Sequence, residues 1–127
     1  MDRARRVIVI DDDDDWRDLV VQFLEDHGFG AVGFADGRAA LEALRGASAT
    51  RTVILLDLEM PGMSGWEFRR EQLRDPRLAR IPVVVATAAD RASIDADAYL
   101  AKPYDSAELC RVLAVVSVKA IAASVAA

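Results

Sequence analysis

The chain has 127 residues, of which 29% are charged, and a net charge of −5 at pH 7. This length fits one domain, which can bury about two-thirds of its unfolded surface without a disulfide or metal staple. The acidic balance argues against nucleic acid as a direct partner, because phosphate binding requires a basic patch. One cysteine, Cys110, and one histidine, His27, exclude an intrachain disulfide and a structural zinc site.

The two ends of the chain predict neither export nor membrane insertion. The charged N-terminus leads directly into an apolar run and lacks the long h-region and cleavage site of a secretory signal. The apolar stretch after Arg111 is interrupted by Lys119 and is too short for a membrane span. A cytoplasmic location is therefore expected, and a single cysteine suits that reducing compartment.

The first predicted elements are a strand and an acidic helix. Val7 to Ile10 form an apolar run that suits a buried strand and leads into five aspartates, Asp11 to Asp15. Asp14 and Asp15 are expected in the first turn of a helix, where the dipole favours negative charge. This amphipathic helix is predicted from residues at helical spacing, namely Trp16, Leu19, Val20, Phe23, Leu24 and His27, with Gly28 as its C-cap.

A weak strand and a second helix follow. Residues 31–34 are predicted as the strand, and Asp36 is predicted as the N-cap of a helix that ends at Gly46. This helix should turn three apolar side chains inward, those of Ala40, Leu41 and Leu44.

The third strand is the clearest in the chain. Val53 to Leu56 are apolar without alternation, which is typical of a strand covered on both faces. Asp57 follows at the carboxyl end of this strand, the edge at which open α/β sheets bind ligands. Ser64 and Glu67 have the spacing of a capping box for a helix that runs to about Arg74.

Two more strands and a long final helix are predicted in the last third of the chain. Residues 83–87 form an apolar run that ends in Thr87, and residues 99–103 form a short strand with Lys102 at its end. Asp105 and Glu108 have capping-box spacing for the final helix. Its apolar stripe consists of Leu109, Val112, Leu113 and Val116.

Strands that alternate with helices predict one α/β domain, residues 1–127, with a parallel five-stranded sheet and helices on both faces. The flavodoxin-like strand order 2-1-3-4-5 is the expected topology. In that order the carboxyl ends of strands 1, 3, 4 and 5 meet at one crevice. The residues expected there are Asp11, Asp12, Asp57, Thr87 and Lys102.

This set of side chains suits phosphoryl transfer. Three clustered carboxylates repel one another and need a cation, and Mg²⁺ prefers hard oxygen ligands of this kind. Lys102 adds a mobile positive charge that can follow an incoming phosphoryl group, and Thr87 adds a hydroxyl donor. Asp57 would be the nucleophile that receives the group.

Four segments resemble the receiver domain of two-component response regulators, and their order and spacing extend the resemblance over nearly the whole chain. They are Val9 to Asp13, Leu56 to Gly65, Thr87-Ala88 and Tyr99 to Tyr104. The resemblance implies a domain that takes a phosphoryl group from a phosphohistidine on a sensor histidine kinase or a histidine phosphotransfer protein. Such a domain catalyses only its own phosphorylation and dephosphorylation, and it switches conformation to control a downstream protein.

The resemblance also implies roles for individual residues. Asp57 would be the phosphoacceptor and a Mg²⁺ ligand, Asp12 a direct ligand and Asp11 a ligand through water, with the Glu59 backbone carbonyl completing the protein ligands. Thr87 and Lys102 would bind the phosphoryl group, and Thr87 and Tyr99 would form the switch pair. The Lys102-Pro103 peptide bond would be cis.

One departure from the family pattern lies between Thr87 and Lys102, where most of the usual fourth helix is missing. We therefore expect a shortened or absent fourth helix. The family's usual output and dimer surface is the face made by helix 4, strand 5 and helix 5. Signalling or homodimer formation by this chain would then use another surface, or the region between Thr87 and Lys102 would be loosely ordered.

A receiver-like docking module that is not phosphorylated is the remaining alternative. The complete acidic set and Lys102 favour the phosphoacceptor. No glycine-rich phosphate loop supports a nucleotide-binding ATPase, and the acid pair precedes the nucleophile, unlike the order in haloacid dehalogenase phosphatases. No output domain follows within these residues, so a stand-alone regulator and a receiver cut from a longer protein both fit the sequence.

Overall fold

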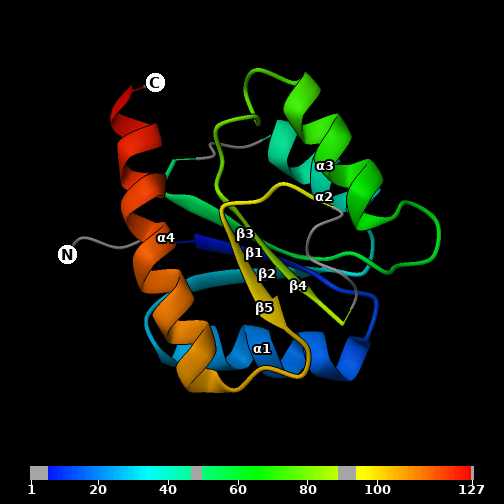
Figure 1. The fold of residues 1–127 in the computed structure, drawn as a ribbon, viewed down its shortest axis with the longest axis vertical. Helices are drawn as coiled ribbons and strands as arrows, with labels where there is room; N and C mark the ends of the chain where they lie inside the picture. The colour runs from blue at the N-terminus through cyan, green and yellow to red at the C-terminus, as the bar shows by residue number, and fades with distance from the viewer. Residues whose placement is uncertain (1–5, 47–49, 89–93, 127) are drawn as a thin grey trace.

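A twisted parallel sheet forms the centre of the molecule (Figure 1). The computed structural model describes residues 6–46, 50–88 and 94–126, with side chains described as far as Ser117. The five strands are β1 (Arg6–Ile10), β2 (Gly30–Phe34), β3 (Thr52–Asp57), β4 (Val83–Thr87) and β5 (Ala98–Ala101). Their order is β2-β1-β3-β4-β5 and every neighbouring pair is parallel, so the predicted topology is confirmed.

The apolar runs of the sequence explain why β1, β3 and β4 occupy the middle of the sheet. Each of these strands is buried along almost its whole length, because helices cover both of its faces. Alternate residues of one strand enter two different cores: Val53 and Leu55 pack on one side of the sheet, while Ile54 and Leu56 pack on the other. Burial on both faces fixes the strand register, and with it the position of each strand end.

Four helices lie within the described residues: α1 (Asp14–Asp26), α2 (Gly37–Arg45), α3 (Gly65–Arg74) and α4 (Ser106–Ala126). Helices α1 and α4 cover one face of the sheet, and α2 and α3 cover the other (Figure 1). The predicted start signals are confirmed. Asp36 caps α2, and Ser64 with Glu67 forms a complete capping box at the start of α3.

Two details differ from the predicted elements. Leu19 was included in the apolar stripe of the first helix, but its side chain is 65% exposed. Helix α1 fully buries only Val20 and Leu24, while Trp16 and Phe23 are partly buried against the same core. The fifth strand ends at Ala101, so Lys102 follows the strand instead of closing it.

The connection between β4 and β5 is short. Its described part, residue 88 and residues 94–97, contains no helix, and residues 89–93 lie outside the described residues. The hydroxyl of Tyr99 donates to the carbonyl of Ile94 at 2.7 Å and accepts from the N–H of Ala96 at 3.1 Å. The guanidinium of Arg69 on α3 donates to the carbonyl of Asp95 at 3.0 Å, which ties this connection to the neighbouring helix.

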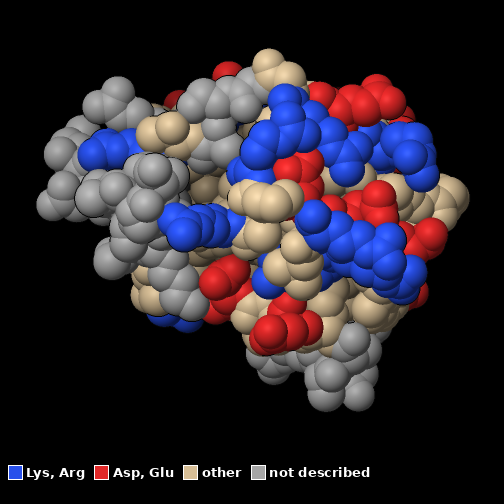
Figure 2. Space-filling view, turned by 90° about the horizontal axis from the view of Figure 1, so that it is seen from above, with Lys and Arg blue, Asp and Glu red and all other residues tan. Residues whose placement is uncertain are grey.

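The surface above α3 carries charges of both signs (Figure 2). Arg45 and Arg77 each pair with Asp75, and Arg74 pairs with Glu71. Acidic partners therefore break up the arginine cluster instead of leaving a continuous basic stripe. None of the helices in the described ranges combines the length and apolar character needed to cross a bilayer.

Candidate functional site

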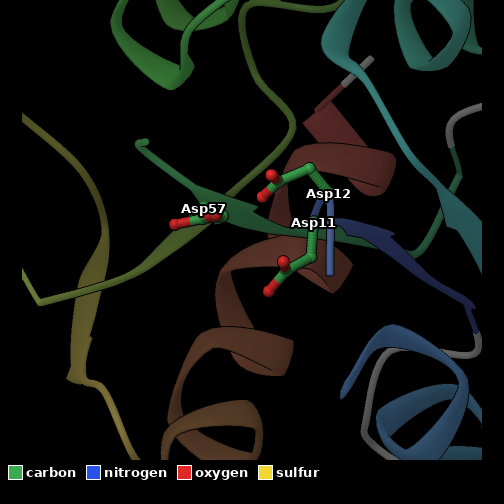
Figure 3. Close-up of side chains that lie close together, drawn as sticks. All are labelled: Asp11, Asp12 and Asp57. Atoms are coloured by element: carbon green, nitrogen blue, oxygen red, sulfur yellow. The ribbon is translucent and has the colours of Figure 1, made fainter. Parts of the chain in front are cut away.

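Three carboxylates meet at the carboxyl ends of β1 and β3 (Figure 3). Asp11 and Asp12 follow Ile10 of β1, and Asp57 is the last residue of β3. The parallel pairing of β1 with β3 places these strand ends side by side, and one oxygen from each carboxylate lies within 4.8 Å of the others. Asp11 and Asp57 are buried, while Asp12 is exposed.

Lys102 supplies a positive charge beside this acidic cluster. It follows β5, and its ammonium Nζ donates to Asp11 Oδ2 at 2.7 Å and lies 3.6 Å from Asp57 Oδ1. The Lys102 N–H donates to the carbonyl of Thr87 at 3.1 Å, which ties the loop after β5 to the end of β4. The peptide bond between Lys102 and Pro103 is cis.

The β1–α1 loop holds Asp11 in a fixed orientation. Its N–H donates to the carbonyl of Phe34 at 3.1 Å, and its Oδ1 accepts from the N–H of Asp13 at 3.0 Å. Asp13 is also the N-cap of α1, because its Oδ1 accepts from the Trp16 N–H at 3.1 Å. The aspartate run therefore serves both the site and the start of the helix.

The pKa of Asp57 is raised from 3.8 to about 6. Burial has the largest effect, since it removes water from the charged form. Lys102 and the backbone N–H of Glu59 lower this pKa, and the negative charges of Asp11 and Asp12 raise it. Without a further cation, the carboxylate of Asp57 is thus poorly compensated at neutral pH.

Gly65 brings the start of α3 against the backbone of Asp57. A Cβ atom at this position would lie 2.6 Å from both the Asp57 carbonyl oxygen and the Leu58 Cα. The Gly65 N–H donates to the carbonyl of Leu58 at 2.8 Å. Only glycine allows the backbone of α3 to come this close to the backbone of β3. The start of α3 therefore packs directly against the end of β3 and fixes the position of Asp57.

Thr87 and Tyr99 lie on the far side of the site from β1. Thr87 is the last residue of β4 and is 2% exposed; it comes directly after Ala86, the register partner of Asp57. Tyr99 pairs in register with Val85, and its half-buried ring packs into the core under α2 and α3. Its hydroxyl already bonds to the backbone of residues 94 and 96.

An apolar groove opens next to the acidic cluster, between α1 and the start of α4. Its cavity volume is about 310 Å³, and its apolar lining includes Trp16, Leu19, Phe23, Tyr104 and Leu109. Trp16 and Tyr104 form the wall between groove and site: Trp16 Nε1 donates to Tyr104 Oη at 3.3 Å, with the rings edge to face at 5.2 Å. The pKa of Tyr104 is raised to about 12, mainly by burial and to a smaller extent by the charges of Asp11 and Asp57, while the hydrogen bond from Trp16 opposes this rise.

The groove was not predicted from the sequence. The sequence pattern places both Trp16 and Leu19 in the apolar stripe of the first helix. One feature of the sequence does indicate such a groove. Trp16, Leu19 and Phe23 make the apolar face of this helix wider than the part that can be buried against the sheet. A stripe wider than the buried face leaves apolar side chains at the surface.

The acidic cluster could hold a metal ion. All of its donors are carboxylate oxygens, and a single ammonium lies beside three acidic groups. The buried and poorly compensated Asp57 would gain from a nearby divalent charge. Oxygen donors of this type, with one exposed member open to water, fit the preference of Mg²⁺ for carboxylates and retained waters.

A flavodoxin-like sheet with an acidic, lysine-containing site at its carboxyl edge defines a class of α/β signalling domains. The chain belongs to the response regulator receiver domain family, whose model matches residues 7–114. Receiver domains are the regulatory domains of two-component systems, and the resemblance noted in the sequence is thereby confirmed.

Curated relatives include transcription-associated regulators. Sensory transduction protein RegX3 of Mycobacterium bovis is 36% identical over 110 residues, which cover 81% of this chain and 46% of RegX3. Phosphate regulon transcriptional regulatory protein PhoB of Escherichia coli is 36% identical over 113 residues, which cover 84% of this chain and 48% of PhoB. The chain therefore spans about half the length of these relatives.

Solved structures support the same fold. Chemotaxis protein CheY4 of Vibrio cholerae superposes with a TM-score of 0.79 at 28% identity, covering 87% of this chain and 97% of CheY4. Response regulator TrrA of Thermotoga maritima superposes with a TM-score of 0.75 at 27% identity, covering 87% of this chain and 97% of TrrA. That TrrA structure is a complex with Mg²⁺ and BeF.

Proposed function

We propose that this receiver domain accepts a phosphoryl group on Asp57 from a phosphohistidine donor, in a Mg²⁺-dependent reaction in the cytoplasm. The observation that carries the proposal is the convergence of three carboxylates and the Lys102 ammonium at one sheet edge. The Mg²⁺ and BeF bound by the related TrrA support the same chemistry.

The proposed reaction is a transfer between two nucleophiles. A carboxylate oxygen of Asp57 attacks phosphorus, the P–O bond forms, and the P–N bond breaks with its electron pair left on the donor imidazole. Lys102 stabilises the negative charge on the phosphoryl oxygens from one side, and the hydroxyl of Thr87 donates to them from the end of β4.

Mg²⁺ would be held by Asp11, Asp12, Asp57 and the backbone carbonyl of Glu59, with Asp11 acting through water. When bound, the ion neutralises charge on the carboxylates and on the transferred group. Two of its carboxylate ligands are already positioned by the protein: Asp11 by its backbone and side-chain bonds, and Asp57 by the close packing at Gly65.

We further propose that the phosphodonor protein docks in the groove between α1 and α4. The groove adjoins the site through the Trp16–Tyr104 wall, so a helix seated there would bring its phosphohistidine to Asp57. Exposed Leu19 and the half-buried Phe23 supply apolar contact area for such a helix.

The proposed output is a change at the end of β4. Phosphorylation adds roughly two negative charges and three acceptor oxygens at one crevice. The Thr87 hydroxyl would turn toward these oxygens, and the Tyr99 ring would move as well. Because the Tyr99 hydroxyl binds the backbone of residues 94 and 96, the connection before β5 would move with it. Because the described part of that connection has no helix, a downstream partner or a second copy would bind another surface.

The test uses a small-molecule phosphodonor, acetyl phosphate, with Mg²⁺. The expected result is a base-labile gain of one phosphoryl group by mass spectrometry, which is absent without Mg²⁺ and in Asp57→Asn. A folded wild-type chain that binds Mg²⁺ but gains no mass would instead support the docking module that is not phosphorylated.

A further inference from the structure

Arg17 lies directly behind the acidic cluster, in the first turn of α1. Its side chain is only 15% exposed. Its Nη1 donates to the backbone carbonyl of Asp11 at 2.7 Å, and its Nη2 donates to Asp14 Oδ1 at 2.7 Å. Sequence patterns gave this arginine no role, because a single basic residue in an acidic helix start usually forms a surface pair.

The carbonyl that Arg17 binds belongs to the peptide bond between Asp11 and Asp12. This contact therefore fixes the peptide plane from which Asp12 continues. Asp11 is already anchored through its N–H, its Oδ1 and its Oδ2, whereas Asp12 is the exposed member of the cluster. The orientation of the Asp12 carboxylate thus depends on the backbone that Arg17 holds.

Gly33 leaves the space through which Arg17 reaches this carbonyl. It lies on β2 and pairs in register with Val9 of β1. A Cβ atom at Gly33 would lie 2.9 Å from Arg17 Cδ, closer than real Cβ contacts, and 3.0 Å from Arg17 Cγ, closer than nearly all of them. Any larger residue at position 33 would therefore displace the arginine side chain.

We propose that Arg17, admitted by Gly33, is a positioning residue that orients Asp12 for Mg²⁺. This inference rests on the proposed function, since it assigns Asp12 to the metal. The role is positional, because the guanidinium fork joins the Asp11 carbonyl to Asp14 and no part of it belongs to the ligand set. A lysine at position 17 keeps the charge but loses the two-pronged geometry.

The experiment measures Mg²⁺ binding alone, by isothermal titration calorimetry, with thermal unfolding in EDTA as the folding control. Arg17→Ala should weaken Mg²⁺ binding roughly tenfold, the usual effect of removing a residue that orients a ligand. Arg17→Lys should fall between Arg17→Ala and wild type. Arg74→Ala, which removes an exposed pair with Glu71, is the matched control and should bind as wild type does.

Gly33→Ala tests the same inference without changing any charge. It should weaken Mg²⁺ binding several-fold in wild type, but add nothing in the Arg17→Ala background, where the clashing stem is gone. Gly46→Ala is its control, because a Cβ there meets only ordinary contacts, the nearest at 3.6 Å. Additive effects of Gly33→Ala and Arg17→Ala would overturn the inference.

The outcomes separate this inference from the proposed function. Wild-type Mg²⁺ affinity in Arg17→Ala, in a chain that gains the phosphoryl group, would overturn the inference and leave the function standing. Arg17-dependent Mg²⁺ binding in a chain that gains no phosphoryl group would overturn the function and support the inference. A wild-type chain that binds no Mg²⁺ would overturn both.

Discussion

The ammonium of Lys102 bonds to Asp11 at 2.7 Å and not to Asp57, whose nearest oxygen is 3.6 Å away. Asp11 is 4% exposed, so this pair satisfies a carboxylate that water cannot reach well. Lys102 therefore stabilises the charged form of Asp57 only in part, and the pKa of Asp57 stays raised at about 6. The structure thus holds the Lys102 ammonium within 3.6 Å of Asp57, close enough to reach the phosphoryl group that we propose for this residue.

The first prediction concerns Lys102→Met. Removing the ammonium leaves buried Asp11 without its partner and raises the pKa of Asp57 further. We expect the metal-free variant to lose about 2 kcal/mol of unfolding free energy at pH 7.5, measured by urea denaturation in EDTA. Arg74→Met, which removes an exposed pair, should lose far less, and equal losses would contradict the prediction.

The second prediction concerns pH and Asp57→Asn. The pKa of Asp57 is about 6 in the folded protein against 3.8 for the free group, so the folded state binds this proton more tightly. Its contribution to stability therefore falls as pH rises from about 4 to about 6 and stays unfavourable above that range. The difference between 3.8 and about 6 corresponds to about 3 kcal/mol, which solvent screening of this incompletely buried group reduces. In EDTA, Asp57→Asn should therefore be about 2 kcal/mol more stable than wild type at pH 7.5, with no gain at pH 4.

Asp75→Asn is the control for that experiment, because its effect on stability at neutral pH should be opposite to that of Asp57→Asn. The hydrogen bond from the Arg77 side chain lowers the pKa of Asp75 to about 2. Asp75 therefore stabilises the fold above its unfolded pKa, and this contribution is lost as pH falls through the folded value. The asparagine variant should be less stable than wild type at pH 7.5. A pH profile of the same sign for both variants would contradict the assignment.

The third prediction concerns Tyr99→Phe. The phenyl ring keeps its packing, but the bonds to the Ile94 carbonyl and the Ala96 N–H are lost. We expect a loss of about 1 kcal/mol in unfolding free energy and faster hydrogen exchange at the Ala96 amide. Tyr104→Phe should leave exchange at Ala96 unchanged. Unaltered Ala96 exchange in Tyr99→Phe would show that the tyrosine does not hold this connection.

The fourth prediction concerns the groove residue Leu19. Its exposed side chain contributes nothing to the core, so Leu19→Asp should fold as wild type does. Phosphotransfer from a phosphorylated histidine kinase should slow about tenfold, because a charge enters an apolar contact. Labelling by acetyl phosphate, which needs no docking, should be unchanged.

Leu73→Asp is the matched control for Leu19→Asp. Leu73 is an exposed leucine on α3, away from the groove. Its variant should keep the wild-type rate with both donors. Equal slowing by Leu73→Asp, or no slowing by Leu19→Asp, would place the donor on a different surface.

The sequence predicted the sheet and the location of the site because both follow from local patterns. Unbroken apolar runs mark β1, β3 and β4, and each run stops at a polar residue. Once the strand order is known, Asp11, Asp57 and Thr87 must lie at one edge. The helix starts could be predicted equally well, because the residues of a capping box lie within four positions of the sequence.

Features that depend on packing between distant segments could not be predicted in this way. Gln72 is fully buried, and its amide donates to the carbonyls of Leu78 and Ile81, a role that no spacing rule marks. The fit of Arg17 over Gly33 requires two elements to meet at one point. The exposure of Leu19 depends on how much of α1 the neighbouring α4 covers.

The contact between Trp16 and Tyr104 gives this chain a fluorescent probe of its own. The Trp16 indole lines the groove on one side and touches a tyrosine that senses the charge of Asp11 and Asp57 on the other. Its emission should therefore respond both to a protein that fills the groove and to negative charge gained at Asp57, the acceptor that we propose. With Trp66→Phe as the background, one native emitter reports the two events without any chemical label.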